Sequence, residues 1–280
     1  MDDFKILIEN DYNEVKDLCK NIWDGCDYIP QVFNRWVNDK NGCFLGLLHN
    51  NQIVALGKYS ILLDNQGWLE GLRVHPNYRG QGFANKISDK LLYIAKKDLN
   101  KNKISSIGMC THLDTPASIK MMTNRGFKLE QSCMVVFKED SNLNLIKNNF
   151  KSNKWEISYN DLINLDYFQN FNKRIVYGFT YLNLNENVYN YLVKSNALIE
   201  VNGYKGIINS KGKDISLISI DETIDSINTL FDYCLATYNT QSIEVYITNP
   251  TQALKHELKR SGFNSLTNYE KDCVYYLYQK

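Results

Sequence analysis

The fold is decided by the stretch Leu72-Arg73-Val74-His75-Pro76-Asn77-Tyr78-Arg79-Gly80-Gln81-Gly82-Phe83-Ala84. An apolar segment typical of a strand, residues 68–74, leads into it, and a segment with apolar residues at helical spacing, residues 85–97, follows it. A loop that enters a helix presents backbone N–H groups without partners, and the helix dipole adds positive potential there. Gly80 and Gly82 let a ligand approach the backbone, because neither has a side chain. The stretch therefore predicts either a phosphate-binding loop or an ordinary turn between strand and helix.

The fixed positions of this loop, Arg79-x-x-Gly82-x-Ala84, differ from the common phosphate loops, since neither the P-loop lysine nor the spacing of the dinucleotide loop is present. With Val74 and Pro76 before it, the loop resembles motif A of the GCN5-related N-acetyltransferases (GNAT family), whose pattern is Gln/Arg-x-x-Gly-x-Gly/Ala. The resemblance implies an acyltransferase that uses acetyl-CoA. It also implies that the coenzyme is bound at these residues: Leu72, Arg73, Val74, Arg79, Gly80, Gln81, Gly82, Phe83 and Ala84.

The element order of the first half is consistent with this resemblance. Hydrophobic periodicity and turn signals predict, over residues 4–138, a strand, two helices, three strands, a helix, a strand, a helix and a last strand. This is the order of the GNAT fold, an α/β (α+β) fold in which helices flank a mixed, mostly antiparallel sheet. We expect a catalytic domain at residues 1–140, a polar linker at residues 141–153 and a second domain at residues 154–280.

The second half repeats the pattern of the first in a degenerate form. Two short matches, separated by the same number of residues, pair Ser106-Ile107 with Ser242-Ile243 and Gly126-Phe127 with Gly262-Phe263. At the position of the phosphate loop, however, the second half has Asp221 and Glu222 and neither glycine nor arginine. Carboxylates repel phosphate. We therefore expect two tandem GNAT-like domains, of which the second does not bind coenzyme A.

A carboxylate within the apolar strand before the loop, Glu70, is the candidate base. Strand alternation places it on one side with Leu72 and Val74, and places Gly71 and Arg73 on the other side. Burial would raise the pKa of Glu70 toward the range in which a carboxylate accepts a proton. Many GNAT members have a Glu four residues before the Val of the motif, and the resemblance implies a base or an amine-binding group. A salt bridge is the alternative. Gly71 predicts a β-bulge or a tight packing contact.

At the position of the acid that protonates the leaving thiolate, this sequence differs from the family pattern. GNAT members have a Tyr four residues before the Gly of the Gly-Phe pair, where this chain has Met122, which cannot donate a proton. His112 is the preferred substitute, Tyr78 or a water molecule is another, and the thiolate can also leave unassisted. An exposed loop histidine without a catalytic role is the alternative for His112. Cys110 suggests a covalent mechanism, but a buried thiol in a strand is the alternative.

The loop before the second helix is expected to receive the acceptor. Asp24, Asp27 and Tyr28 place carboxylates where a cationic amine would enter, and a solvated turn is the alternative. Asp27 and Tyr28, with the aromatic residues that follow them and with residues 70–74, resemble a GNAT subgroup that includes the vertebrate histidine N-acetyltransferase. This resemblance favours an amino acid or related small molecule as the acceptor.

The composition excludes several other classes of protein. The 280 residues are enough for two domains, 44% of them are hydrophobic, and a net charge of +1 gives no reason to expect nucleic acid or an anionic membrane as a partner. Apolar runs are too short to cross a membrane, and residues 1–5 lack the pattern of a signal peptide. Seven scattered cysteines and four histidines form no metal-ligand motif. We expect a cytoplasmic protein that has no metal and acts on a small-molecule amine, with no prediction of oligomeric state.

Three hypotheses for the function follow from these observations. The first is an acetyl-CoA-dependent N-acetyltransferase of small molecules with Glu70 as base. The second is a sensor or scaffold that binds acetyl-CoA without turnover, which Met122 in the place of the acid would allow. The third is an N-acetyltransferase of proteins.

Overall fold

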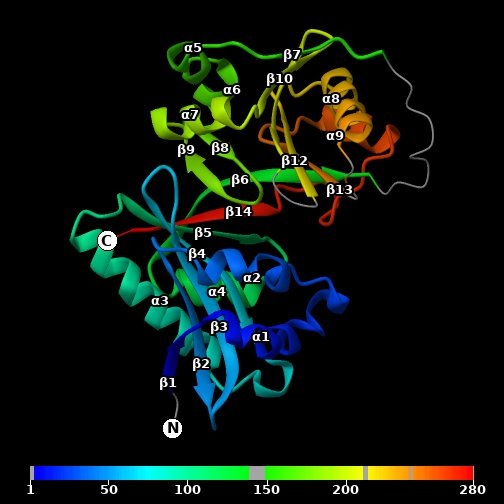
Figure 1. Ribbon diagram of the computed structural model, residues 1–280. Helices are drawn as coiled ribbons and strands as arrows, with labels where there is room; N and C mark the ends of the chain where they lie inside the picture. Colours follow the sequence, from blue (N-terminus) through cyan, green and yellow to red (C-terminus); the bar gives the residue numbers. More distant parts are fainter. Residues whose placement is uncertain (1–2, 139–148, 211–213, 239, 241, 280) are drawn as a thin grey trace. The chain divides into compact units, whose positions relative to one another are not determined.

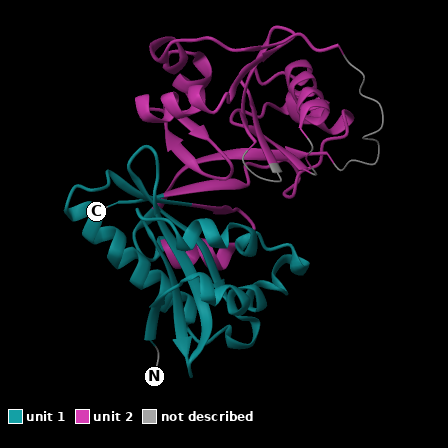
Figure 2. Cartoon of the chain, in the orientation of Figure 1, with its two compact units in different colours: residues 1–109, 123–127, 277–280 teal, residues 110–122, 128–276 magenta. Residues whose placement is uncertain are grey.

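The computed structural model describes residues 3–138, 149–210, 214–238, 240 and 242–279. They form two compact units (Figure 2). The first unit comprises residues 1–109, 123–127 and 277–280, and the second comprises residues 110–122 and 128–276. The predicted domain limits therefore do not coincide with the compact units and stay predictions. Most of the expected linker lies outside the described residues, and its last two residues, Ser152 and Asn153, are in a strand.

The first unit is a sheet with helices on both faces (Figure 1). Its strands lie in the order β1-β2-β3-β4-β5 and are antiparallel except for β4 and β5, which are parallel. In chain order the elements are β1 (Asp3–Ile6), α1 (Tyr12–Cys19), α2 (Ile29–Val37), β2 (Cys43–His49), β3 (Gln52–Ile61), β4 (Gln66–Val74), α3 (Phe83–Asn100) and β5 (Ser106–His112), whose last three residues belong to the second unit.

The helices of the first unit pack on opposite faces of this sheet. Leu56 of β3 belongs to the apolar cluster that α1 and α2 form with the sheet, together with Phe33 and Trp36. The next residue, Gly57, faces α3, because a Cβ built there would lie 2.7 Å from Leu91 Cδ1. Successive residues of a strand point to opposite faces, so α3 covers the face that α1 and α2 leave open.

The second unit is also a sheet with covering helices. Its strands lie in the order β14-β6-β13-β12-β11-β10-β7, and β8 and β9 form a separate hairpin. The elements are α4 (Pro116–Thr123), β6 (Phe127–Phe137), β7 (Ser152–Lys154), α5 (Tyr159–Ile163), α6 (Asp166–Asn170), β8 (Arg174–Val176), β9 (Tyr181–Asn183), α7 (Glu186–Lys194), β10 (Leu198–Val201), β11 (Tyr204–Asn209), β12 (Asp214–Ser219), α8 (Ile224–Thr237), β13 (Ser242–Ile247), α9 (Gln252–Arg260) and β14 (Cys273–Tyr278). The units share one feature with the expected repeat: β12 and β13 are parallel, as β4 and β5 are.

The last strand of the first sequence half and the last residues of the second half do not stay with their own halves. Strand β6 follows α4 in the first half of the sequence, yet it pairs with β13 in the second unit, where Val136 lies opposite Val245. Conversely, residues 277–280 at the end of the chain belong to the first unit, where Gln279 N donates to Gly126 O at 3.1 Å. Short local sequence signals do not specify this exchange, because antiparallel partners are chosen over long sequence separations.

Candidate active site

The loop between β4 and α3 has the backbone that its glycines predict. Gly80 and Gly82 have φ of 77° and 83°, in the left-handed region that strongly favours glycine. A Cβ built on either residue would meet no atom within 4 Å, so the space beside both glycines is open. The glycines therefore serve the backbone turn and leave room for a ligand against it.

Backbone donors gather in this loop without partners from the protein. Gly82 precedes the first residue of α3, and no side chain caps the helix there. Within residues 3–138, no acceptor is found for the backbone N–H groups from Gly80 to Ala84, whereas Lys86 N already bonds to Gly82 O at 3.2 Å. Unpaired donors at a helix N-terminus, together with the helix dipole, form a site for an anion such as a pyrophosphate.

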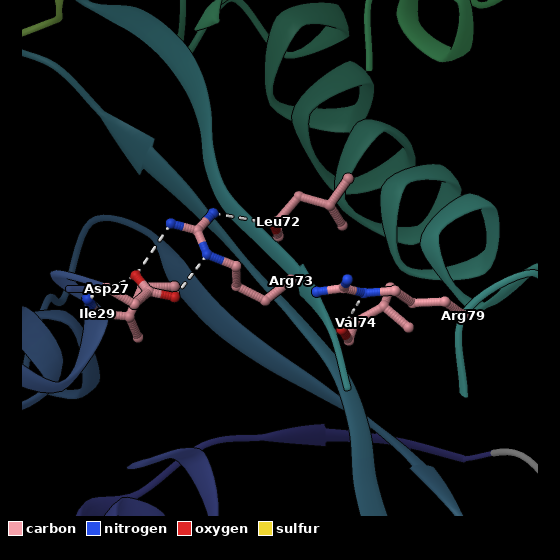
Figure 3. Close-up of polar contacts among 6 residues, drawn as sticks. All are labelled: Asp27, Ile29, Leu72, Arg73, Val74 and Arg79. Carbon is pink, nitrogen blue, oxygen red and sulfur yellow. Dashed lines mark hydrogen bonds and ion pairs between the residues drawn. The ribbon is translucent and has the colours of Figure 1, made fainter. Parts of the chain in front are cut away.

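Two side chains of the loop have contrasting positions. Phe83 is buried, with its ring centroid 5.2 Å from that of His49 and 6.1 Å from that of Tyr78, so it anchors the start of α3. Arg79 is exposed and lies along the end of β4, where its Nε is 3.5 Å from Val74 O (Figure 3). Its guanidinium thus keeps a positive charge near the open donors.

The parallel strands β4 and β5 pair only at their beginnings. Their register includes Gln66 with Ser106, Gly67 with Ile107 and Trp68 with Gly108, although β4 continues to Val74. Among the described residues, no pairing joins β4 to β5 beyond Trp68. The two strands therefore diverge after Trp68, which leaves main-chain groups of β4 available to a ligand.

A β-bulge at Gly71 changes which side chains share a face of the sheet. The pairs Leu56 with Arg73 and Lys58 with Glu70 leave two residues of β4, Gly71 and Leu72, opposite one residue of β3. Gly71 has φ of 67°, and a Cβ there would lie 2.5 Å from Trp36 of α2. Both interpretations of this glycine, a bulge and a tight packing contact, are thus confirmed.

The bulge corrects the strand alternation expected from the sequence. Simple alternation put Glu70 and Arg73 on opposite faces, but the extra residue brings both to the face that α2 covers. Lys58, opposite Glu70, bonds to Asp39 just after α2, and Arg73 bonds to Asp27 just before it. Figure 3 shows Arg73 and Leu72 pointing to opposite sides of β4.

The carboxyl of Glu70 lies in an environment suited to a base. Ser60 Oγ donates a hydrogen bond to Glu70 Oε1 at 2.8 Å. Burial of the carboxyl raises the pKa of Glu70, and the Ser60 hydrogen bond and the charges of Lys58 and Arg35 offset part of this rise. No ion pair of Glu70 is found among the described residues, so the salt-bridge alternative has no support. A carboxyl with a raised pKa can take a proton from an ammonium group.

Arg73 and Asp27 form a buried ion pair beside this group (Figure 3). Arg73 Nε and Nη2 donate to the two carboxylate oxygens of Asp27 at 2.7 and 3.0 Å, and Nη1 donates to Leu72 O at 3.0 Å. The Arg73 Cζ lies 4.3 Å from the ring centroid of Trp23. The Arg73 side chain is therefore fully engaged by the protein. Its place in the coenzyme site and the role of Asp27 in binding an amine stay predictions.

Tyr28 is the aromatic residue among those expected to bind the acceptor. Its ring is 37% exposed, stacks 6.2 Å from Trp23 and meets Trp36 edge-on at 5.9 Å. Desolvation of the hydroxyl raises the pKa of Tyr28, and the negative charge of Glu70 raises it further. The structure thus brings Tyr28, Glu70 and Arg73 together, as part of one face of the first unit.

His112, the expected acid, and Cys110, the candidate nucleophile of a covalent mechanism, both belong to the second unit. The ring of His112, at the end of β5, lies 4.7 Å from that of Phe179, and its buried Nδ1 has no hydrogen-bond partner among the described residues. The role of His112 stays a prediction. Cys110 Sγ lies 3.4 Å from Cys273 Sγ, and burial raises the pKa of the Cys110 thiol. Since the thiolate is the reactive form, this raised pKa argues against Cys110 as a nucleophile.

The second unit has a carboxylate at the position of the coenzyme loop. Glu222 precedes α8 and accepts hydrogen bonds from Thr248 N, from Thr248 Oγ1 at 2.8 Å and from Asn249 N at 3.0 Å. Burial raises the pKa of Glu222. At the start of α8 itself, Thr223 Oγ1 accepts from Ser226 N at 3.3 Å, so a side chain caps this helix where α3 has no cap. This supports the expectation that the second half binds no coenzyme.

Ser60, Lys58 and Arg35 act on Glu70 but were not among the candidate residues. Ser60 and Lys58 alternate on the strand that precedes β4, which is a signal for a shared face once β3 and β4 are known to pair. Arg35 gives no comparable signal, because its neighbourhood depends on how α2 packs on the sheet.

Two hollows of the surface lie apart from these groups. One of about 500 Å³ in the second unit is lined by Asn149, Phe150, Asn202, Tyr204, Asp225, Asn228, Thr229 and Asp232. One of about 400 Å³ in the first unit is lined by Phe4, Leu47, Lys86, Asp89, Lys90 and Tyr93. Glu70 and the loop from Arg79 to Ala84 line neither of them.

The described residues also bear on metal binding and on membrane crossing. They contain no group of three or more His, Cys, Asp or Glu side chains arranged to hold a metal ion. None of their helices has both the length and the apolar character that a membrane crossing requires.

Comparisons with known proteins bear on the first half of the chain. Residues 8–127 match the model of the Acetyltransferase (GNAT) family. A histidine N-acetyltransferase of Oreochromis niloticus is 32% identical over 82 residues, which are 29% of this chain and 24% of that protein. A histidine N-acetyltransferase of Xenopus tropicalis is 31% identical over 85 residues, which are 29% of this chain and 26% of that protein. The chain thus spans about a quarter of the length of these relatives.

Solved structures resemble the whole chain. The GCN5-related N-acetyltransferase of Sphaerobacter thermophilus matches 99% of this chain and 95% of its own, with a TM-score of 0.61 and 9% identity. A GCN5-related glucosamine N-acetyltransferase region of a fungal multi-domain GH3 β-N-acetylglucosaminidase matches 99% of this chain and 38% of its own, with a TM-score of 0.60 and 12% identity. At these identities the likeness shows the fold, and the mixed sheet flanked by helices expected from the sequence is confirmed.

Proposed function

Because residues 8–127 match the model of the Acetyltransferase (GNAT) family, we propose that the protein transfers the acetyl group of acetyl-CoA to the amine of a small molecule. The observation that carries the proposal is the row of unpaired backbone donors from Gly80 to Ala84, beside glycines with open space. Pyrophosphate fits such a row. The main-chain groups of β4 beyond Trp68 would receive the pantetheine arm, and Arg79 would add positive charge.

The chemical step in this proposal is direct attack. Glu70 takes a proton from the acceptor ammonium, directly or through a water molecule. The free amine attacks the thioester carbonyl and a C–N bond forms. The C–S bond breaks with its electron pair leaving on sulfur, and the nitrogen releases its second proton to water, which gives the neutral amide. The thiolate then takes a proton from His112, from Tyr78 or from water. Water suffices chemically, because a thiolate is a good leaving group, and Tyr78 already donates to Gln52 Oε1 at 3.1 Å.

The acceptor is a small amine in this proposal, and an amino acid is favoured. The relatives that match the chain over 82 and 85 residues are named for histidine N-acetylation. The mixed environment of Tyr28, Trp23 and Glu70 suits a molecule with one cationic amine and an organic side chain. We also propose that the second half, residues 154–280, is a degenerate GNAT-like domain without a coenzyme site, as Glu222 supports.

A coenzyme sensor without turnover is a second candidate, and one observation favours it. Met122 occupies the place of the usual acid, and it is buried, so it can neither donate a proton nor contact solvent. The two candidates differ in whether any amine is consumed.

Release of free thiol from acetyl-CoA tests the proposal. The purified protein is incubated with acetyl-CoA and, separately, with amino acids, polyamines, aminoglycosides and a peptide with a free N-terminus. Turnover with at least one small amine is the expected result. Turnover with the peptide alone would support a protein acetyltransferase instead. Tight binding of acetyl-CoA by calorimetry with no turnover of any amine would support the sensor, and no binding would overturn both.

A further inference from the structure

Helix α2 presents a row of polar side chains on the side that faces Glu70. Tyr28, at the N-terminus of α2, and Arg35, in its last turn, are seven residues apart, which is about two turns and places them along one face of the helix. Asp39 follows just beyond the end of the helix. The two ends of the row are located by their contacts. The Arg73 Cζ lies 5.4 Å from the ring centroid of Tyr28, and Asp39 bonds to Lys58, the cross-strand neighbour of Glu70. Arg35 therefore lies between two groups that both border Glu70.

The guanidinium of Arg35 is exposed and unengaged. In the part of the chain that the structure describes, no hydrogen bond or ion pair of Arg35 is found. The other cations beside Glu70 are already used, since Lys58 bonds to Asp39 and to Tyr59 O, and Arg73 bonds to Asp27. The positive charge of Arg35 reaches Glu70, where it is one of the groups that lower the carboxyl's pKa.

We propose that Arg35 binds the carboxylate of the acceptor, so that the substrate is an α-amino acid or another amine that bears a carboxylate. The inference rests on the proposed function and names the substrate class of the same site. Arg35 and Glu70 offer opposite charges to the two ends of a zwitterion, and a guanidinium pairs with a carboxylate through two parallel hydrogen bonds. An ordinary solvated arginine is the alternative. The row with Tyr28 and Asp39 and the prior engagement of Lys58 and Arg73 argue against it.

Pairs of acceptors that differ only in the carboxylate test this inference. The value of kcat/KM is measured for an amino acid and its decarboxylated amine, for example histidine with histamine and tyrosine with tyramine, and for the amino acid amide. The wild type should favour the acid in each pair. Arg35→Gln should lower kcat/KM for the acid about ten- to hundredfold, mostly through KM, because a hydrogen-bonded charge pair is lost. It should leave the amine and the amide nearly unchanged, and Arg35→Lys should retain part of the preference.

The matched control is Lys40→Gln, which removes an exposed positive charge five residues from Arg35 and outside the row. It should change neither acceptor of a pair. Equal effects of Arg35→Gln on acid and amine, or a wild type that prefers the amine, would overturn the inference while leaving the acetyltransferase proposal intact.

A binding measurement makes the test independent of turnover. Amino acids and the matching amines are titrated by calorimetry into protein saturated with coenzyme A. Binding of the acid that Arg35→Gln weakens and Lys40→Gln preserves would support the inference. Failure of the wild type to bind any amino acid under these conditions would overturn it, whereas absence of coenzyme binding in the same experiment would reject the proposed function itself.

Discussion

At the scale of single residues, Glu70 shows how the surroundings of a side chain set its chemistry. The sequence indicates a carboxylate in an apolar strand, and the structure adds the groups that tune it: burial raises the pKa of Glu70, while the Ser60 hydrogen bond and the charge of Lys58 offset part of the rise. Ser60 and Lys58 belong to a neighbouring strand. The carboxylate in an apolar strand was therefore visible in the sequence, but the residues that adjust its pKa were not, and the role of Glu70 as a base stays a prediction.

Replacing Glu70 by Gln should reduce kcat about 10²- to 10⁴-fold, the range for loss of a general base. The affinity for coenzyme A should not change. In the wild type, kcat/KM should rise with pH through the raised pKa of the free enzyme's Glu70, since only the ionised carboxylate accepts a proton. Steady-state kinetics from pH 5 to 9 would check the loss of kcat and the pH dependence of kcat/KM. An unchanged kcat in Glu70→Gln would contradict the assignment of Glu70 as the base.

The same variant should be more stable than the wild type at neutral pH. A carboxyl whose pKa is higher in the folded state than in the unfolded state stabilises the fold when protonated, and this contribution is lost as the pH rises through the raised pKa. Gln resembles the protonated form and keeps the contribution at all pH values. The melting temperature of Glu70→Gln should therefore exceed that of the wild type at pH 7, and the difference should shrink below pH 4.

At the scale of elements, the bulge in β4 decides the layout of the candidate site. One extra residue brings Glu70 and Arg73 to the same face. Only glycine suits the bulge position, because Gly71 has φ of 67° and the ring of Trp36 leaves no space for a Cβ. The sequence marks Gly71 as unusual. It does not say which later residues change face, because that depends on where β3 pairs with β4.

Gly71→Ala should destabilise the protein by about 2–5 kcal/mol, since it combines left-handed strain with a clash against Trp36. Gly203→Ala is the matched control, because Gly203 has φ of 89° but open space at its Cβ. The control should show the strain alone, about 1–2 kcal/mol. Chemical denaturation measures both. Equal losses would mean that the Trp36 contact does not constrain Gly71.

The loop before α3 allows an equally direct comparison. Gly82→Glu places a side chain and a negative charge beside the unpaired donors and should lower the affinity for coenzyme A at least tenfold. Gly262→Glu, at φ of 80° with open space in the second unit, suffers similar strain without facing the coenzyme. Calorimetric titration should show weakened binding in the first variant and wild-type binding in the second. The reverse pattern would place the coenzyme in the other half.

At the scale of the whole molecule, two units of related architecture differ in what occupies the start of a helix. Among the described residues, no protein acceptor is found for the donors before α3, whereas at the start of α8 the Thr223 Oγ1 accepts from Ser226 N at 3.3 Å and Glu222 stands next to this cap. A helix start that is capped by a side chain and has a carboxylate beside it does not attract an anion.

The chain should therefore bind one coenzyme A molecule. Calorimetry or native mass spectrometry gives the stoichiometry, and a value of two would contradict the proposal for the second half. Glu222→Ala should lower the melting temperature, because the Thr248 and Asn249 donors lose their acceptor, and it should not add a second binding event.

The sequence by itself determined what depends on neighbours along the chain. The loop from Arg79 to Ala84, the element order around it and the carboxylate at Glu70 all follow from residues within a few positions of one another, because turns, helix starts and strand alternation are local properties. Only the tertiary structure decided that Arg73 pairs with Asp27 across 46 positions, that the bulge turns Arg73 to the side of Glu70, and that β6 pairs with β13. These contacts form between segments far apart in the sequence, where register and packing select the partner and no local pattern records the choice.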